Sequence, residues 1–243
     1  MSDYLKRTIN KELLESQYLE SPRRIKVYLP PGYNEMVSYP VIYCQDGNEF
    51  FTMMRIATTA NRLILDESME PMIIVGVSND LGKRTSEYSA TGSRNKDYKK
   101  FFIEDLVPFI ENKYPVRTDK ENRILCGDSL SSTVSFHLAL DRPDLFSKVI
   151  SFSGAFFDAS IEEATSRQDL SWLEMWMIVG LEETDVETHI GTYDFLSYNR
   201  RMKKVLEERT VSLSYQEAHG GHTWGFWQGV LPDAMRHFFP TNQ

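Results

Sequence analysis

The residue best placed for covalent chemistry is a serine among small residues, in the pentad Gly127-Asp128-Ser129-Leu130-Ser131. A β-rich run over 123–126 precedes this pentad, and an amphipathic helical pattern follows it. The order is that of a nucleophile elbow, Gly-x-Ser-x-Gly, with serine in place of the last glycine. A sharp strand-to-helix turn exposes the serine hydroxyl, and helix N-terminal N–H groups can stabilise an oxyanion. The alternative is that these polar residues only cap an ordinary helix.

A serine nucleophile needs a general base, and with this motif the base follows the last strand of the sheet. One of the five histidines, His222, stands in Gly220-Gly221-His222-Thr223-Trp224, before a closing helical pattern. The two glycines leave the backbone free to present the imidazole, and His219 is the local competitor. His219 and His222 could also form a metal motif, but no further Cys/His cluster supports it. We therefore predict no metal and no cofactor.

The acid that would orient the imidazole is expected after the strand that ends at Gly180. Acidic residues follow there at Glu182, Glu183 and Asp185. Each carboxylate could hold the imidazole tautomer and stabilise the imidazolium. Residue chemistry alone leaves the choice open, and at most one of them is catalytic. A solvated acidic loop is the alternative.

A second oxyanion donor is expected from the loop after the third strand of the sheet. The segment Gln45-Asp46-Gly47-Asn48 follows the apolar run over 41–44 and fits this place, although Asp-Gly-Asn is also common turn chemistry. The ordered set of elbow, acid loop and histidine loop is more specific than any member alone. It predicts an active-site serine at Ser129.

Short apolar runs alternate with helical patterns along the chain, which predicts a mainly parallel sheet with helices on both faces. Strands of this sheet are expected over 41–44, 72–77, 123–126, 149–152, 176–179 and 211–215. Antiparallel strands leading in are expected around 4–9, 13–19 and 25–29, and helices over 49–65, 98–110, 195–206 and 224–238, with Pro108 kinking or breaking the second. Sites in such sheets lie at the carboxyl ends of the strands.

The composition fits one domain over residues 1–243, since 243 residues with 41% hydrophobic content are near the ceiling for one core. The net charge of −8 argues against nucleic acid as a partner. Two cysteines, Cys44 and Cys126, are too few for a disulfide framework and suit a reducing compartment. The polar N-terminus lacks a signal-peptide core, and the apolar runs fall far below the ~18 residues of a membrane span. We expect a cytoplasmic protein without a membrane partner, and no oligomeric state is predicted.

Several segments together resemble a known family. They are Val27–Tyr33, Val41–Gly47, Arg84–Tyr88, Glu104–Ile110, the Ser129 elbow, Ser151–Ala155 and Gly220–Trp224. In order and number these segments resemble the putative-esterase family of the α/β-hydrolases. This family includes enterobactin-type siderophore esterases, S-formylglutathione hydrolases and feruloyl esterases.

The resemblance implies an α/β-hydrolase fold with Ser129 as nucleophile and His222 as base. It favours Glu183 as the acid, because the family places its acid three residues after the glycine that ends the strand, here Gly180. Many relatives carry Asp at this place, and some siderophore esterases work with only Ser and His. The elbow also departs from the family, with Ser131-Ser132 where two glycines are usual.

The resemblance further implies oxyanion donors at the backbone N–H of Leu130 and of Asn48 or Gly47. It places Arg84 beside the substrate, with a surface salt bridge to Glu87 as the alternative. Aromatic residues that could line the cleft are Phe50, Phe51, Trp224 and Phe226, although such residues are more often part of a core.

The expected function is hydrolysis of a small-molecule carboxylic ester through an acyl-enzyme. Only about 17 residues, 158–174, lie where many hydrolases insert a lid, so a small lid or none is expected. An open cleft favours a soluble bulky or polar ester, such as a siderophore or an acylated sugar, over long-chain fats. The alternatives are a thioesterase of the S-formylglutathione hydrolase type and a degenerate hydrolase retained as a binding module.

Overall fold

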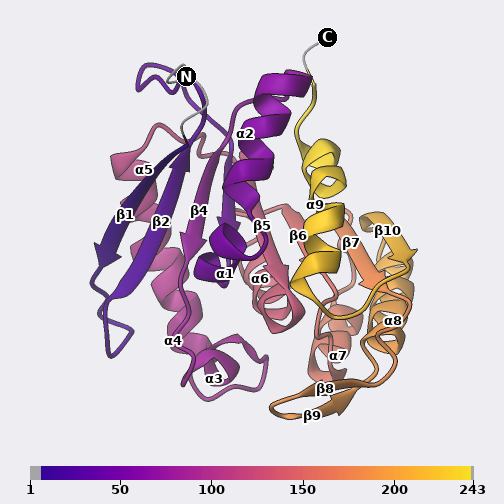
Figure 1. Ribbon diagram of the computed structural model, residues 1–243. Helices are drawn as coiled ribbons and strands as arrows, with labels where there is room; N and C mark the ends of the chain where they lie inside the picture. Colours follow the sequence, from indigo (N-terminus) through magenta and orange to yellow (C-terminus); the bar gives the residue numbers. More distant parts are fainter. Residues whose placement is uncertain (1–6, 242–243) are drawn as a thin grey trace.

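The central element is an eight-stranded sheet, seen in a computed structural model that describes residues 7–241 (Figure 1). Its strand order is β1-β2-β4-β3-β5-β6-β7-β10. The strands are β1 (Thr8–Leu14), β2 (Arg23–Leu29), β3 (Val41–Cys44), β4 (Ile73–Val77), β5 (Arg123–Asp128), β6 (Lys148–Phe152), β7 (Glu174–Gly180) and β10 (Ser212–Ala218). β1 and β2 pair antiparallel with each other, and β2 pairs antiparallel with β4, whereas the strands from β4 to β10 pair in parallel. The mostly parallel α/β sheet and its antiparallel lead-in confirm the sequence prediction.

Both faces of the sheet are covered by helices, which explains why its central strands are continuous apolar runs. Alternate residues of β3 point to opposite faces: Val41 and Tyr43 join one hydrophobic cluster, and Ile42 and Cys44 join the other. Helices α1 (Gly47–Thr52), α2 (Ile56–Glu67) and α9 (Trp224–Phe238) cover the second face (Figure 1). The first face carries α4 (Asn95–Lys100), α5 (Val107–Lys113), α6 (Ser129–Asp141), α7 (Asp158–Ser166) and α8 (Phe195–Glu208).

Three of the expected helices differ in detail. The pattern over 49–65 forms α1 and α2, separated at Arg55, whose φ of 56° is left-handed. The pattern over 98–110 is continued between α4 and α5 by a π-helical segment (Phe101–Leu106), and Pro108 lies directly after this segment, in the first turn of α5. Helix α6 is not amphipathic, because its residues from Leu130 to Leu140 are all buried.

The N-terminal expectations are partly wrong. The first strand, β1, ends at Leu14, so the strand expected over 13–19 is not formed there. The strand expected around 4–9 begins outside the described residues and overlaps β1 only at its end. Alternation of half-buried and exposed residues along β1 is what an edge strand with one solvated face shows.

A small hairpin, β8 (Val186–Thr188) and β9 (Gly191–Tyr193), follows β7 and was not expected from the sequence. It lies at the same end of the molecule as the short helix α3 (Arg84–Tyr88), at the lower edge of Figure 1. The segment where a lid was considered, 158–174, instead contains α7.

Cys44 and Cys126 are register partners on the neighbouring strands β3 and β5, and both are buried free thiols. In the part of the chain from 7 to 241, no helix has the length and apolar character needed to cross a bilayer.

Candidate active site

The strand-to-helix turn at Ser129 has the geometry of an elbow. Ser129 has a left-handed φ of 48°, directly after β5 and at the start of α6. Such a conformation in a non-glycine residue costs about 1–3 kcal/mol and tends to mark functional sites. A Cβ on Gly127 would lie 2.3 Å from the Ser131 carbonyl group and 2.5 Å from the Ser132 nitrogen. The turn therefore requires glycine at position 127.

The two serines that replace the usual glycines hold this turn together. Ser131 Oγ accepts the Asp128 N–H at 2.7 Å, while the Asp128 carboxylate accepts the Ser131 N–H, which forms a capping box. Ser132 Oγ donates to the Gly127 carbonyl at 2.6 Å. Both hydroxyls are directed at the backbone of the turn, so the departure from the glycine pattern leaves the elbow intact.

An acid–base pair lies next to the elbow. Glu183 Oε2 is 2.6 Å from His222 Nδ1, and Glu183 is fully buried while the His222 side chain is 13% exposed. The other carboxylate oxygen, Oε1, accepts hydrogen bonds from Ser153 Oγ at 2.6 Å and from the Gly180 N–H at 2.8 Å. Trp227 Nε1 in turn donates to Ser153 Oγ at 2.8 Å. The carboxylate is thus fixed in one orientation, aimed at the imidazole.

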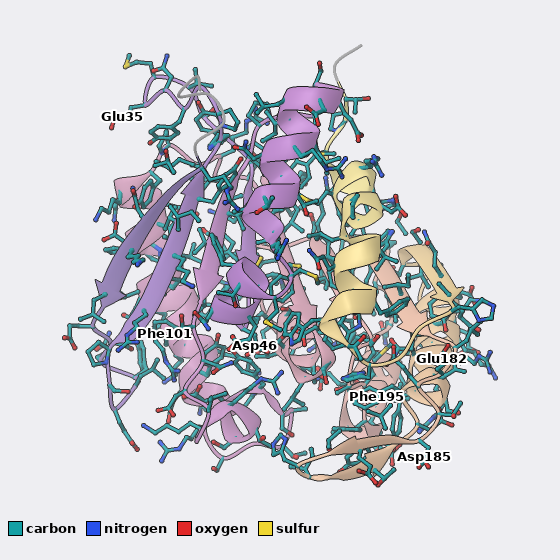
Figure 2. The ribbon with its side chains drawn as sticks, viewed as in Figure 1. Glu35, Asp46, Phe101, Glu182, Asp185 and Phe195 are labelled. Atoms are coloured by element: carbon teal, nitrogen blue, oxygen red, sulfur yellow. The ribbon has the colours of Figure 1, made fainter. Side chains whose placement is uncertain are left out.

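Only one residue of the acidic loop reaches the histidine. Glu182 and Asp185 are exposed, and Figure 2 shows them toward the outer edge of the molecule. The acidic loop and the histidine loop approach each other at Gly180, where there is no room for a side chain. A Cβ there would lie 2.1 Å from the Gly220 carbonyl oxygen and 2.7 Å from the Glu183 carboxylate. His219, the local competitor as base, is exposed.

The His222 ring is held between aromatic side chains. Its centroid is 4.0 Å from that of Phe195 and 4.8 Å from that of Trp227, which stands nearly perpendicular to it. Since Nδ1 faces Glu183, Nε2 is the nitrogen left for proton transfer. Ser129 and His222 line the same pocket, and the serine hydroxyl makes no hydrogen bond to any residue between 7 and 241. Such contacts commonly tighten only when substrate is bound.

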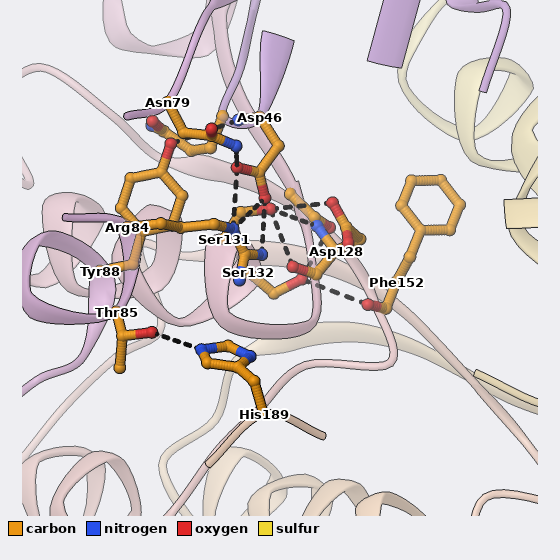
Figure 3. Close-up of polar contacts among 12 residues, drawn as sticks. Asp46, Asn79, Arg84, Thr85, Tyr88, Asp128, Ser131, Ser132, Phe152 and His189 are labelled. Carbon is orange, nitrogen blue, oxygen red and sulfur yellow. Dashed lines mark hydrogen bonds and ion pairs between the residues drawn. The ribbon is translucent and has the colours of Figure 1, made fainter. Parts of the chain in front are cut away.

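The pocket has a volume of about 510 Å³ and opens at the carboxyl ends of the parallel strands. One wall is aromatic: Phe157, Tyr193, Phe195, Trp224 and Trp227. The polar part of the lining consists of Asp46, Glu49, Asn79, Arg84 and Asp128. The β8–β9 hairpin closes one side, where His189 Nε2 lies 2.8 Å from Thr85 Oγ1 of α3 (Figure 3).

Arg84 lies in the pocket wall and binds a neighbouring carboxylate. Its Nε is 2.9 Å from both oxygens of Asp46, and its Nη2 is 2.6 Å from Oδ2 (Figure 3). Asn79 also donates to Asp46, whose own backbone is left-handed at φ 49°. The alternative salt bridge from Arg84 to Glu87 does not form, because Glu87 is buried against Arg23.

Asp128, the residue before Ser129, is a buried acid in the same polar cluster. Burial and the nearby charge of Asp46 raise the pKa of Asp128 to about 7, although the Arg84 charge opposes this shift. Asp46, Asp128 and Arg84 therefore form a charged cluster next to the elbow, in which the guanidinium offsets part of the repulsion between the two carboxylates.

The expected oxyanion donors lie at two helix N-termini. Leu130 is in the first turn of α6, and Gly47 and Asn48 begin α1. N–H groups of a first turn have no acceptor within their own helix. Asp46 and Leu130 both line the pocket, and the Asn48 side chain points to Lys26, whose Nζ is 2.8 Å from its Oδ1. Gly47 and Asn48 both stay candidates for the second donor.

Of the aromatic candidates, Trp224 lines the pocket and Phe50 does not. Phe50 is fully buried in the core, with its ring 5.9 Å from that of Trp224, so it supports Trp224 from behind. The sequence analysis gave no role to Ser153 or Trp227, which hold the acid. Ser153 stands in a resemblance segment, but the segment gives no sign of its role; in the structure it has a left-handed φ of 47° after β6, and its hydroxyl donates to Glu183.

Comparison with known proteins decides the family. The family model described as "Putative esterase" matches residues 16–238. The chain belongs to this esterase family. Carboxylic ester hydrolysis is the activity of the family, and the elbow, acid and histidine loop described above all lie inside the matched range. The uncharacterized protein YjcH of Bacillus subtilis (strain 168) is 33% identical to this esterase over 232 residues, which are 94% of this chain and 96% of the relative.

Solved structures show the same fold. A ferulic acid esterase matches with a TM-score of 0.81 at 18% identity, covering 96% of this chain and 98% of that one. The enterobactin esterase of Shigella flexneri, solved in the presence of enterobactin, matches with a TM-score of 0.82 at 17% identity and covers 95% of this chain and 59% of that one. The predicted α/β-hydrolase fold is confirmed.

Proposed function

We propose that this esterase cleaves its substrate through an acyl-enzyme formed on Ser129. The observation that carries the proposal is the hydrogen bond between the buried Glu183 and His222. His222 lines the same pocket as Ser129. His222 Nε2 takes the hydroxyl proton as Ser129 Oγ attacks the ester carbonyl, and it returns the proton to the leaving alcohol. Water then attacks the acyl-enzyme with the same base, and the acid is released. Glu183 stabilises the imidazolium that forms in each step.

The developing oxyanion would be stabilised by the Leu130 N–H and by that of Gly47 or Asn48. Removal of one such donor typically costs about 10²–10³-fold in kcat. The helix dipoles of α1 and α6 add to this stabilisation, because both N-termini lie at the pocket.

The pocket supports a soluble, bulky or polar ester as substrate, such as a siderophore or an acylated sugar. Its aromatic residues would pack against a ring or a sugar face, while Asp46, Asn79 and Arg84 supply polar lining. The buried free thiols of Cys44 and Cys126 suit the cytoplasmic location that we include in this proposal.

The test is hydrolysis of a short-chain 4-nitrophenyl ester together with labelling by a fluorophosphonate probe. We expect turnover and labelling in the wild type, and a loss of at least about 10³-fold in kcat with no labelling in Ser129→Ala. Ser166→Ala, which removes an exposed hydroxyl on α7, is the matched control and should behave as the wild type.

Two results would contradict the proposal. Turnover that survives in Ser129→Ala would rule out this nucleophile. An absence of both turnover and labelling in the wild type would favour a binding module without catalysis.

A further inference from the structure

A second groove continues from the catalytic pocket along β1 and β2. Its volume is about 770 Å³, and it shares Glu49, Asn79 and Leu81 with the catalytic pocket. These shared residues follow the carboxyl ends of β3 and β4. A ligand bound at Ser129 could therefore extend past them into the second groove.

This groove contains cations without counterions. Lys11, Arg24 and Lys26 line it and form no ion pair with any residue from 7 to 241. The other charged groups along it are largely neutralised within the fold: Arg23 pairs with Glu87, Glu12 with Lys113, and Asp80 with Lys83. Glu49 lies at the junction of the two cavities, and its negative charge acts on Lys26. The excess positive charge of this groove is opposite in sign to the net charge of the chain, which is −8.

The cations also stand close to one another. Lys11 and Lys26 are directly opposite in the β1–β2 register, and Arg24 lies two residues before Lys26 on the same face of β2. Like charges directly opposite each other in a sheet are destabilising. Burial and the Lys11 charge lower the pKa of Lys26, with the nearby Glu49 charge opposing them. A bound anion would relieve this repulsion.

Protection of the sheet edge against pairing with another chain does not explain all three cations, Lys11, Arg24 and Lys26. Lysines often prevent edge-to-edge pairing, and β1 is an edge strand, so Lys11 alone could serve that purpose. Arg24 and Lys26, however, lie on β2, which is paired on both sides. Lys26 also donates a hydrogen bond to the side chain of Asn48, which lies in the first turn of α1 and lines the same groove.

We infer that this groove binds a negatively charged group of the ester substrate, a carboxylate or a phosphate, through Lys11, Arg24 and Lys26. The inference rests on the proposed function, and it adds that the preferred substrate carries an anion at a distance from the scissile bond. The three cations are specificity determinants and take no part in bond cleavage.

The test compares esters that differ only in a remote charge. Mono-4-nitrophenyl adipate and 4-nitrophenyl hexanoate share a six-carbon acyl chain, and only the first carries a carboxylate. A second pair, the butyryl esters of 4-hydroxybenzoate and of phenol, places the charge on the alcohol side. For each pair, the ratio of kcat/KM for the anionic ester to that for the neutral ester is measured at low salt, after subtraction of the uncatalysed rate.

We expect Lys26→Gln and Arg24→Gln each to lower this ratio about threefold in at least one pair, which is the range of a single partly exposed ion pair. Glutamine at position 26 removes the charge and keeps a side-chain N–H donor, on a chain one atom shorter than that of lysine. Lys204→Gln, an exposed charge on α8, is the matched control and should leave the ratio unchanged. Added NaCl should lower the wild-type ratio.

The outcomes separate the two proposals, because a ratio within one variant cancels any loss of folded or active protein. Ser129-dependent hydrolysis with a ratio that is the same in wild type, Lys26→Gln and Arg24→Gln overturns the anion site alone. If the wild type hydrolyses none of the four esters, the proposed function fails and the anion site fails with it.

Discussion

Glu183 differs from Glu182 and Asp185 in its surroundings and not in its chemistry. Its carboxylate is buried and accepts hydrogen bonds from Ser153 and Gly180, while the other two carboxylates are exposed. The acidic loop could be recognised from the sequence, but the choice within it could not. That choice depends on the close approach of Gly180 to Gly220, which joins segments forty residues apart.

Glu183→Gln should therefore lower kcat by about 10²-fold or more, with little change in KM. The amide cannot stabilise the imidazolium and favours the wrong imidazole tautomer. Asp185→Asn, an exposed change in the same loop, should stay within about twofold of the wild type. Steady-state kinetics with a nitrophenyl ester measure both, and a larger loss in Asp185→Asn would show that the assignment of the acid is wrong.

Among the elements, the contact between α3 and the loop before α1 shapes the oxyanion region. Arg84 of α3 holds both oxygens of Asp46, and Asp46 is the left-handed residue that turns the chain into α1. The sequence placed Arg84 beside the substrate. In the structure its guanidinium binds the Asp46 carboxylate, and we propose that it positions the N–H groups of Gly47 and Asn48.

If Arg84 positions this loop, Arg84→Gln should lower kcat by about tenfold while KM changes little. The reason is that the oxyanion donors act only in the transition state. Arg84→Lys should recover part of the rate by keeping the charge beside Asp46. Arg201→Gln, an exposed arginine on α8, provides the control. A rise in KM with unchanged kcat would instead mean that Arg84 binds substrate.

The elements that could be predicted are those with a clear hydrophobic period. The strand over 41–44 and the helix over 224–238 have the expected bounds. The β8–β9 hairpin was missed because its strands are three residues long and largely exposed, so no buried face imposes a pattern. The break at Arg55 was missed because it depends on a left-handed backbone in a residue that rarely adopts one.

At the scale of the whole molecule, stability should depend on a histidine remote from the site. His137 of α6 is buried, and its Nε2 lies 3.0 Å from Ser160 Oγ of α7. Burial, together with the Lys99 charge, lowers the pKa of His137 to about 4 from an ordinary value of 6.5. The folded state therefore holds this imidazole neutral, while the unfolded chain takes up a proton more readily.

The free energy of unfolding is highest above pH 6.5, where His137 is neutral in both states. It falls between pH 6.5 and 4, because there the unfolded chain binds a proton at His137 that the folded state does not. We expect the free energy of unfolding of the wild type to drop by up to about 3 kcal/mol more than that of His137→Gln over this interval. Urea unfolding at several pH values measures the difference. His219→Gln, at an exposed position, should follow the wild type, and parallel curves for wild type and His137→Gln would contradict the assignment.

The left-handed backbone at Ser129 sets a limit on how this protein can be improved. A glycine there would adopt the same φ without strain and, at this position, would raise stability. It would also remove the hydroxyl. A directed-evolution screen that rewards heat resistance alone would thus enrich variants lacking the hydroxyl that we propose as the nucleophile, and any such campaign must score turnover alongside survival.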